Sequence, residues 1–220
     1  MTSSIDLPNY EIAIIGLGPV GATLANILGQ HEISTVVIEQ DAAPHHLPRA
    51  VAFDDEVMRI FQSIDLAKPI NDIVDVGEGV DFVDENGEVL VKWDRPKVIS
   101  PNGWYINYRF HQPELEAILR EGLLRFPSVQ TLLHREVLDL IEDIDGVCVE
   151  FKDLKTGKKG KIRSNFVIGC DGARSFTREK IGKGFEDLGF NEPWLVVDLV
   201  LKNPRPDLGP QSVHHCDPNR

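Results

Sequence analysis

Three glycines near the N-terminus, Gly16, Gly18 and Gly21, have the spacing GxGxxG. In a turn between a strand and a helix, the first glycine permits the tight turn and the second lets backbone approach a ligand. The third glycine lets the helix pack closely on the strands. The first turn of such a helix offers unpaired N–H groups and a partial positive charge. The motif therefore predicts a loop that binds the diphosphate of a dinucleotide.

An acidic residue, Glu39, follows this motif at the end of a second apolar run, Thr35–Ile38. A carboxylate in this place can accept hydrogen bonds from both hydroxyls of an adenosine ribose. Such a contact favours an unphosphorylated ribose, so the expected ligand is NAD or FAD before NADP. A glycine-rich turn in an unrelated α/β protein remains the alternative.

The elements around the motif support the dinucleotide interpretation. Tyr10–Ile15 is apolar and rich in β-branched residues, which predicts a buried parallel strand ending at Gly16. An apolar helical stretch follows and fades near Gly29, where the helix is expected to end. The turn into the second strand often starts with glycine in such units, and Glu32 stands there instead. A strand, a helix and a downstream acid are the context that a lone glycine motif lacks.

The rest of the chain does not continue as alternating strands and helices. A helix is expected over Asp54–Leu66, and another begins at Gln112 with proline in its first turn. A hairpin is expected at Val80–Val83 and Glu88–Trp93. The residues after the second helix predict a β-meander, which counts against a doubly wound NAD-dependent dehydrogenase. Its expected strands are Glu136–Ile141, Gly146–Phe151 and Lys161–Ile168.

A second candidate motif lies at the end of the meander. Asp171 and Gly172 follow an apolar strand directly, and Ser175 and Arg178 come soon after. Ligands of α/β sheets bind at the carboxyl ends of strands, so an acid and a turn in this place suit a binding site. By itself, an Asp-Gly pair indicates only a turn.

Composition excludes several classes of protein. The chain has 220 residues, 42% of them hydrophobic, and a formal net charge of −12. An acidic chain repels nucleic-acid phosphates, so no nucleic-acid partner is expected. No apolar run approaches the length of a membrane span, and no secretory signal is recognisable. Unpaired cysteines without zinc spacing predict a cytoplasmic protein with no metal; these are Cys148, Cys170 and Cys216.

Together the two motifs resemble those of the FAD-dependent aromatic hydroxylases, the single-component flavoprotein monooxygenases with the para-hydroxybenzoate hydroxylase fold. Within that family, Trp104–Glu116 and His214–Pro218 are most similar to 3-(3-hydroxyphenyl)propionate hydroxylases. The resemblance implies an α/β fold: a Rossmann-like FAD-binding domain with a β-meander and an incomplete antiparallel substrate-domain sheet. In this family NADH or NADPH reduces the flavin, and the reduced flavin activates O2 for attack on a phenol ring.

The resemblance also implies roles for single residues. Arg49 matches an arginine near the flavin, Gln112 a glutamine that reaches the cofactor, and Val137 a backbone contact to adenine. The structural alternatives are a surface charge for Arg49 and a polar residue at the start of a helix for Gln112. No catalytic residue is assigned. The implied cofactor contacts are Gly16, Gly18, Pro19, Val20, Gly21, Glu39, Gln40, Arg49, Gln112, Val137, Asp171 and Gly172.

Two domains are expected. Residues 1–182 form the FAD-binding domain, with an inserted hairpin at about 76–98 that belongs to the substrate side. Residues 183–220 begin a truncated substrate domain, whose first strand is expected at Trp194–Leu201 with an exposed apolar edge. The family's second FAD motif, a Gly-Asp segment, is not found in the chain.

The expected function is hydroxylation of a phenolic aromatic acid with NAD(P)H and O2, in the catabolism of aromatic compounds. The first alternative is a non-catalytic FAD-binding fragment of such an enzyme. An NAD-dependent dehydrogenase is a more distant alternative. The choice between NADH and NADPH, the exact substrate and the oligomeric state, including a homo-oligomer, stay open.

Overall fold

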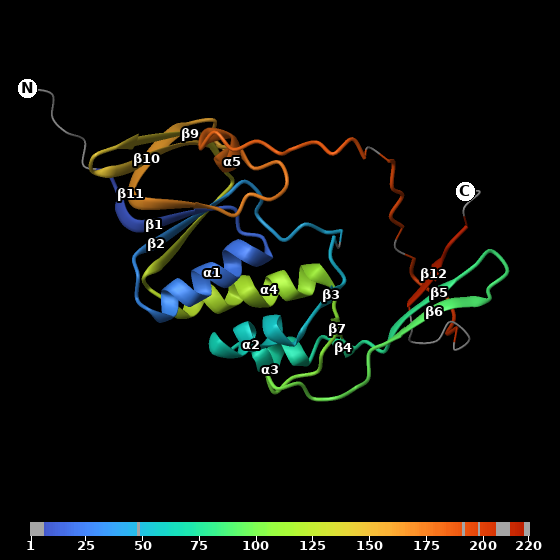
Figure 1. Ribbon diagram of the computed structural model, residues 1–220. Helices are drawn as coiled ribbons and strands as arrows, with labels where there is room; N and C mark the ends of the chain where they lie inside the picture. Colours follow the sequence, from blue (N-terminus) through green and yellow to red (C-terminus); the bar gives the residue numbers. More distant parts are fainter. Residues whose placement is uncertain (1–6, 48, 191, 198, 206–211, 218–220) are drawn as a thin grey trace, which may run out of the picture.

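The computed structural model describes residues 7–47, 49–190, 192–197, 199–205 and 212–217. Its largest element is a sheet with the strand order β8-β2-β1-β11-β10-β9 (Figure 1). The strands β8, β2, β1 and β11 are parallel to one another. The strands β11, β10 and β9 form an antiparallel meander. The strands are β1 (Asn9–Ile15), β2 (Thr35–Glu39), β8 (Val129–Leu133), β9 (Arg135–Asp143), β10 (Gly146–Asp153) and β11 (Lys159–Gly169).

The strand β8 has no counterpart among the sequence expectations. It pairs with the outer side of β2, with Ile38 opposite Leu132, and so extends the parallel part of the sheet by one strand. The meander and both N-terminal strands are confirmed. The lysines of the β10–β11 turn are exposed, which is typical of a hairpin turn in contact with solvent.

Helices cover one face of the parallel strands, and α1 and α4 lie against each other there (Figure 1). The Asn26 side chain of α1 is fully buried and donates a hydrogen bond to the Leu119 carbonyl of α4 over 2.8 Å. The core on this face includes Ile14, Met58 and Tyr108, which are all fully buried. The helices are α1 (Pro19–Gln30), α2 (Asp55–Ser63), α3 (Ala67–Asn71), α4 (Gln112–Gly122) and the 3₁₀ turn η1 (Leu123–Arg125).

A second apolar cluster lies on the opposite face of the parallel strands. It joins Ala13 and Val36 of the first two strands to Val149 of β10 and Ile162 of β11. Both faces of β1 and β2 are therefore buried, which explains why their sequences are continuously apolar rather than alternating.

The turn between α1 and β2 shows why glycine is common there. The helix ends at Gln30, one residue past the expected Gly29, and Glu32 then has φ +56°. This left-handed conformation is favourable for glycine and costs energy for a residue with a Cβ. Glu32 therefore replaces the usual glycine but keeps the left-handed backbone conformation that glycine would adopt there.

Two smaller sheets follow. The first has the order β3-β7-β4 and has no counterpart among the sequence expectations, since each of its strands has only two residues. The second has the order β12-β5-β6 and contains the expected hairpin. Their strands are β3 (Ala52–Phe53), β4 (Asp75–Val76), β7 (Tyr108–Arg109), β5 (Gly79–Val83), β6 (Val89–Asp94) and β12 (Ser212–His215).

The strand β12 corrects one expectation about the C-terminal residues. The sequence favours exposed loop residues over ligands for His214 and His215; both are exposed, but they lie in β12, which pairs in parallel with β5. The His214 ring packs against the Phe82 ring, with 5.0 Å between the ring centroids. The β12-β5-β6 sheet is therefore mixed, with an antiparallel pair and a parallel pair.

The expected strand at Trp194–Leu201 is wrong for the described residues of that segment. Residues 192–197 and 199–201 form no strand, and they follow α5 (Phe176–Lys180) outside any sheet. The expected apolar exposure is present, because the Trp194, Leu195 and Val200 side chains are exposed. A strand needs a hydrogen-bonding neighbour, and the apolar run has none within the described chain. The domain boundaries stay a prediction.

No helix in the described ranges is both long and apolar enough to cross a membrane.

Candidate cofactor-binding site

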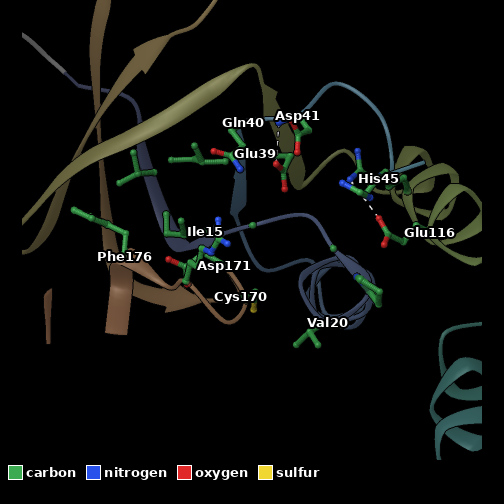
Figure 2. Close-up of a pocket in the computed structure, with 18 of the residues that line it drawn as sticks. Ile15, Val20, Glu39, Gln40, Asp41, His45, Glu116, Cys170, Asp171 and Phe176 are labelled. Carbon is green, nitrogen blue, oxygen red and sulfur yellow. Dashed lines mark hydrogen bonds and ion pairs between the residues drawn. The ribbon is translucent and has the colours of Figure 1, made fainter. Parts of the chain in front are cut away.

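A cavity of about 850 Å³ opens at the carboxyl ends of β1, β2 and β11, with α4 on its other side (Figure 2). This is the edge where ligands of α/β sheets bind. Of the twelve residues predicted to contact a cofactor, all except Gly21 line this cavity. They are Gly16, Gly18, Pro19, Val20, Glu39, Gln40, Arg49, Gln112, Val137, Asp171 and Gly172.

The three motif glycines have separate structural roles. Gly16 has φ +100°, and a Cβ there would lie 2.5 Å from the Cys170 carbonyl oxygen. A Cβ at Gly21 would lie 2.0 Å from the Gly16 carbonyl oxygen, so Gly21 serves close packing of the helix rather than the cavity wall. At Gly18, which precedes the first turn of α1, a Cβ would meet no protein atom within 4 Å. The protein itself therefore requires glycine at Gly16 and Gly21 but not at Gly18.

The Glu39 carboxylate joins the glycine loop to the end of β2. Its Oε2 accepts a hydrogen bond from the Leu17 N–H over 2.7 Å, and its Oε1 accepts one from the Asp41 N–H over 2.9 Å. Each carboxylate oxygen can accept more than one hydrogen bond. Glu39 can therefore hold the loop and still accept from hydroxyl groups of a ligand.

Gln112, at the start of α4, is buried and contacts the loop that carries Arg49. Its Oε1 accepts hydrogen bonds from the backbone N–H groups of Arg49, over 2.8 Å, and Ala50, over 2.9 Å. Its Nε2 donates to Glu116 Oε1 over 2.7 Å. The amide lines the cavity, and its main partners in the chain are the loop and Glu116.

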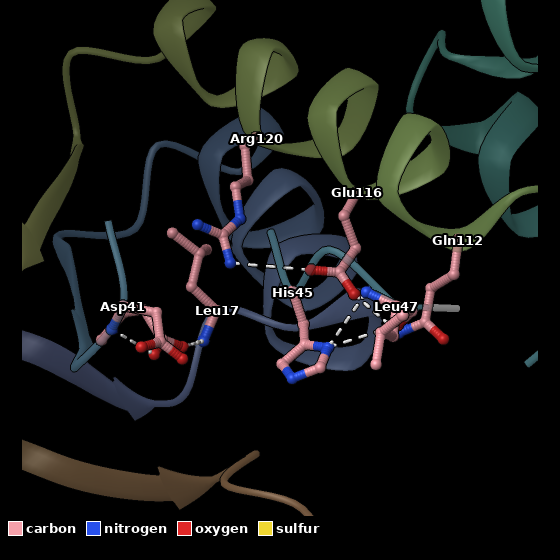
Figure 3. Close-up of polar contacts among 8 residues, drawn as sticks. Leu17, Asp41, His45, Leu47, Gln112, Glu116 and Arg120 are labelled. Carbon is pink, nitrogen blue, oxygen red and sulfur yellow. Dashed lines mark hydrogen bonds and ion pairs between the residues drawn. The ribbon is translucent and has the colours of Figure 1, made fainter. Parts of the chain in front are cut away.

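Two polar residues of α4, Glu116 and Arg120, were missed in the sequence. Both line the cavity, and Glu116 is 1% exposed. Arg120 Nη2 lies 3.6 Å from Glu116 Oε2, and its Nε and Nη1 are buried with no hydrogen-bond partner among the described residues. Figure 3 shows Gln112, Glu116 and Arg120 on successive turns of the same face of α4. Their i, i+4, i+8 spacing was the available signal, because polar residues on one face must meet a polar environment.

Asp171 fixes the turn between β11 and α5. Its Oδ1 accepts from the Ser175 hydroxyl over 2.5 Å, and its Oδ2 accepts from the Thr177 N–H over 2.9 Å. Burial alone would raise the pKa of Asp171, but these hydrogen bonds outweigh it, so the pKa is lowered. Asp171 is therefore an ionised structural acceptor that also lines the cavity.

The remaining wall adds charged and aromatic groups that the sequence did not single out. Arg135 is held by an ion pair with Asp153, with 2.9 Å between Nη2 and Oδ2. Burial, followed by the nearby Asp171 charge, raises the pKa of the Cys170 thiol, so this cysteine stays protonated near neutral pH. The additional lining residues include His45, Glu136, Arg174 and Phe176.

Among the described residues, the cysteines form no metal site, and Trp104, Tyr105 and Tyr108 do not line the cavity. Within the described ranges, no group of three or more His, Cys, Asp or Glu side chains could hold a metal ion. Cys148, Cys170 and Cys216 are free. Tyr108 is fully buried, and Trp104 and Tyr105 are partly buried against the same core, so these aromatic residues contribute to packing.

The glycine loop, the helix N-terminus and the carboxylate at the end of β2 define a dinucleotide-binding domain of the Rossmann-like type. The cavity fits such a ligand, because its wall combines the open position at Gly18 with acceptor capacity at Glu39. The chain belongs to the FAD binding domain family, whose sequence profile matches residues 9–218.

Curated hydroxylases are similar to the chain. A probable NADH-specific resorcinol 4-hydroxylase of Rhodococcus jostii (strain RHA1) is 37% identical over 211 residues, covering 94% of this chain and 39% of the relative. A 3-(3-hydroxy-phenyl)propionate/3-hydroxycinnamic acid hydroxylase of Paraburkholderia xenovorans (strain LB400) is 36% identical over 210 residues. That match covers 96% of this chain and 33% of the relative. The chain thus spans between a third and two fifths of the length of these relatives.

Solved structures share the fold. The p-nitrophenol 4-monooxygenase PnpA of Pseudomonas putida DLL-E4 superposes with a TM-score of 0.73 and 26% identity, over 80% of this chain and 44% of PnpA. The flavin-dependent monooxygenase PieE, solved in complex with FAD and substrate, superposes with a TM-score of 0.71 and 22% identity. That match covers 79% of this chain and 32% of PieE. The expected α/β FAD-binding fold is confirmed.

Proposed function

We propose that the cavity binds FAD through the residues that the sequence motifs single out. Glu39 and Val137 would hold the adenosine, the Gly16–Gly21 loop the diphosphate, and Arg49 and Gln112 the flavin side. Gly18 carries this proposal, because it is the motif glycine that the protein fold does not need. A missing side chain at the N-terminus of α1 is explained by a ligand whose phosphates lie against the backbone.

We further propose that the chain is the FAD-binding part of a monooxygenase that hydroxylates a phenolic aromatic acid, such as a 3-(3-hydroxyphenyl)propionate-like compound. Bound FAD would accept electrons from NAD(P)H and activate O2, which no amino-acid side chain can do. The family membership and the hydroxylase names of the relatives support this activity. One relative is named NADH-specific, which makes NADH the first co-substrate to test.

The residues of the chain would then position and enclose the cofactor. The backbone of the glycine loop and the α1 N-terminus would bind the diphosphate, and Glu39 would accept from the ribose. Gln112 would hold the loop of Arg49 against α4 by accepting hydrogen bonds from the Arg49 and Ala50 backbone N–H groups. The base that accepts the phenol proton is not assigned to any residue of this chain.

A second candidate is a chain that binds FAD without turnover by itself. The exposed Trp194, Leu195 and Val200 favour it, because apolar side chains in such number are normally covered by further protein. In both candidates the 220-residue chain binds FAD, and they differ in whether it hydroxylates a phenol.

The test is a titration of the chain with FAD, in which binding is measured by quenching of flavin fluorescence. A calorimetric titration with NAD is carried out in parallel. We expect saturable FAD binding and much weaker NAD binding. NADH oxidation is then measured with and without a hydroxyphenylpropionate, with the product assayed. Binding of NAD in preference to FAD would refute the cofactor proposal, whereas FAD binding without product would favour the second candidate.

A further inference from the structure

An ion pair and three hydrogen bonds along α4 form a continuous series from Arg120 to the loop of Arg49. Arg120 Nη2 faces Glu116 Oε2 at 3.6 Å, and Glu116 Oε1 accepts from Gln112 Nε2 at 2.7 Å. Gln112 Oε1 then accepts from the backbone N–H groups of Arg49 and Ala50. Both Gln112 and Glu116 are almost completely buried, so water cannot easily replace these partners.

The direction of each hydrogen bond in this series is determined by chemistry. Arg120 can only donate, and the two backbone N–H groups can only donate. The Glu116 carboxylate can only accept, so Gln112 must turn its Nε2 toward Glu116 and its Oε1 toward the loop. A carboxylate is needed at position 116, because acceptors are required on both sides of it.

We propose that Glu116 and Arg120 are positioning residues that fix the amide orientation of Gln112 and, through it, the backbone of Arg49 and Ala50. The proposal rests on FAD binding only for its functional consequence, since the loop geometry can be measured without a ligand. With the loop fixed, Arg49 keeps one place beside the flavin side of the cavity. The pair thereby organises the binding site before the cofactor enters, which lowers the cost of binding.

The variant Glu116→Gln tests the polarity of the series. The new amide at position 116 has one acceptor oxygen, and the Arg120 charge competes most strongly for it, because hydrogen bonds to charged groups are the stronger ones. The nitrogen of the new amide then faces Gln112, whose own amide turns over and presents its nitrogen to the loop. The loop N–H groups lose their acceptor. We expect exchange of the Arg49 and Ala50 amide hydrogens, followed by NMR, to accelerate about tenfold or more.

The double variant Gln112→Glu with Glu116→Gln restores an acceptor to every donor. The new carboxylate at position 112 accepts from the loop and from the amide nitrogen at position 116, while the amide oxygen at position 116 accepts from Arg120. We expect exchange of the Arg49 and Ala50 amide hydrogens within about threefold of the original protein. The single variant Gln112→Glu places two carboxylates in contact and should bind FAD more weakly than the double variant, with the difference increasing toward alkaline pH.

A matched control is Glu121→Gln, which removes the same charge from an exposed position of α4. It should leave amide exchange and FAD affinity unchanged. Fast exchange in Glu116→Gln with rescue by the double variant supports the proposal, and rescue alone supports it if Glu116→Gln does not fold. Unchanged exchange in Glu116→Gln, or a double variant that stays fast or unfolded, overturns it. If the loop responds as expected but no variant and no original protein binds FAD, the cofactor proposal fails and the positioning role stands.

Discussion

The Glu39 carboxylate accepts a hydrogen bond from the Leu17 N–H over 2.7 Å, so the residue expected to bind ribose also holds the glycine loop. Its other oxygen accepts from the Asp41 N–H over 2.9 Å. A substitution at Glu39 therefore acts on the loop and on the ligand together. The two effects can be separated by comparing ligands with and without adenosine.

We expect Glu39→Gln to lower FAD and ADP affinity by about tenfold to a hundredfold, because hydrogen bonds to a charged acceptor contribute about 1.5–3 kcal/mol. The affinity for FMN, which lacks the adenosine, should change little. Fluorescence titration with FAD and FMN and calorimetry with ADP provide the measurements. An equal loss for FMN would show that Glu39 acts through the loop alone.

Alanine at two motif glycines should give opposite results. Gly16→Ala should destabilise the fold by about 2 kcal/mol or more, because its Cβ meets the Cys170 carbonyl and its φ is positive. Gly18→Ala has open space for its Cβ, so its thermal unfolding should match the original protein while FAD binding weakens. Calorimetric melting beside FAD titration tests the pair. Undiminished FAD binding by Gly18→Ala would remove the main support for the cofactor proposal.

Asp171 should make the free energy of unfolding depend on pH in the acidic range. Since its folded pKa is lowered, the carboxylate stabilises the fold above its unfolded pKa, and this stability is lost as pH falls through the folded pKa. We expect Asp171→Asn to flatten the decline of unfolding free energy on the acid side of about pH 4. Urea unfolding from neutral pH down to about pH 3 measures the difference. Parallel pH curves for the two proteins would contradict the assignment.

Glu32→Gly should stabilise the protein. The left-handed backbone at φ +56° costs a residue with a Cβ about 1–2 kcal/mol, and glycine avoids that cost while losing about 0.5–1 kcal/mol of unfolded-chain entropy. The expected gain is a fraction of a kcal/mol to about 1 kcal/mol, seen as a higher melting temperature. Glu32→Ala is the control, since it keeps the Cβ and should show no gain.

Local sequence signals predicted the parts of the fold that depend on neighbouring residues. The glycine motif, the two N-terminal apolar strands and the meander turns each occupy a few consecutive positions, and all are present in the structure. The strand β8 has a short sequence with weak alternation, and its pairing with β2 joins residues far apart in the chain. Such pairings depend on tertiary packing, which local patterns do not record.

The candidate site was predicted in the same uneven way. Gly18, Glu39 and Asp171 belong to motifs with a known spacing, whereas Glu116 and Arg120 look like ordinary charges of an amphipathic helix. Their burial depends on which face α4 turns toward the cavity. The run Trp194–Leu201 shows the converse, since its strand-forming composition has no partner in the described chain.

The parallel pairing of β1 with β11 places Ile15 beside Gly169, and the Cys170 N–H donates to the Ile15 carbonyl over 2.7 Å. The glycine loop and the Asp171 turn therefore come from opposite ends of a long stretch of polypeptide. During synthesis on the ribosome, the glycine loop is made early, and the cavity is complete only after the Asp171 turn has been made. A nascent chain that ends before this turn carries the glycine motif and still lacks part of the cavity wall, so the complete site requires translation through β11 and the turn after it.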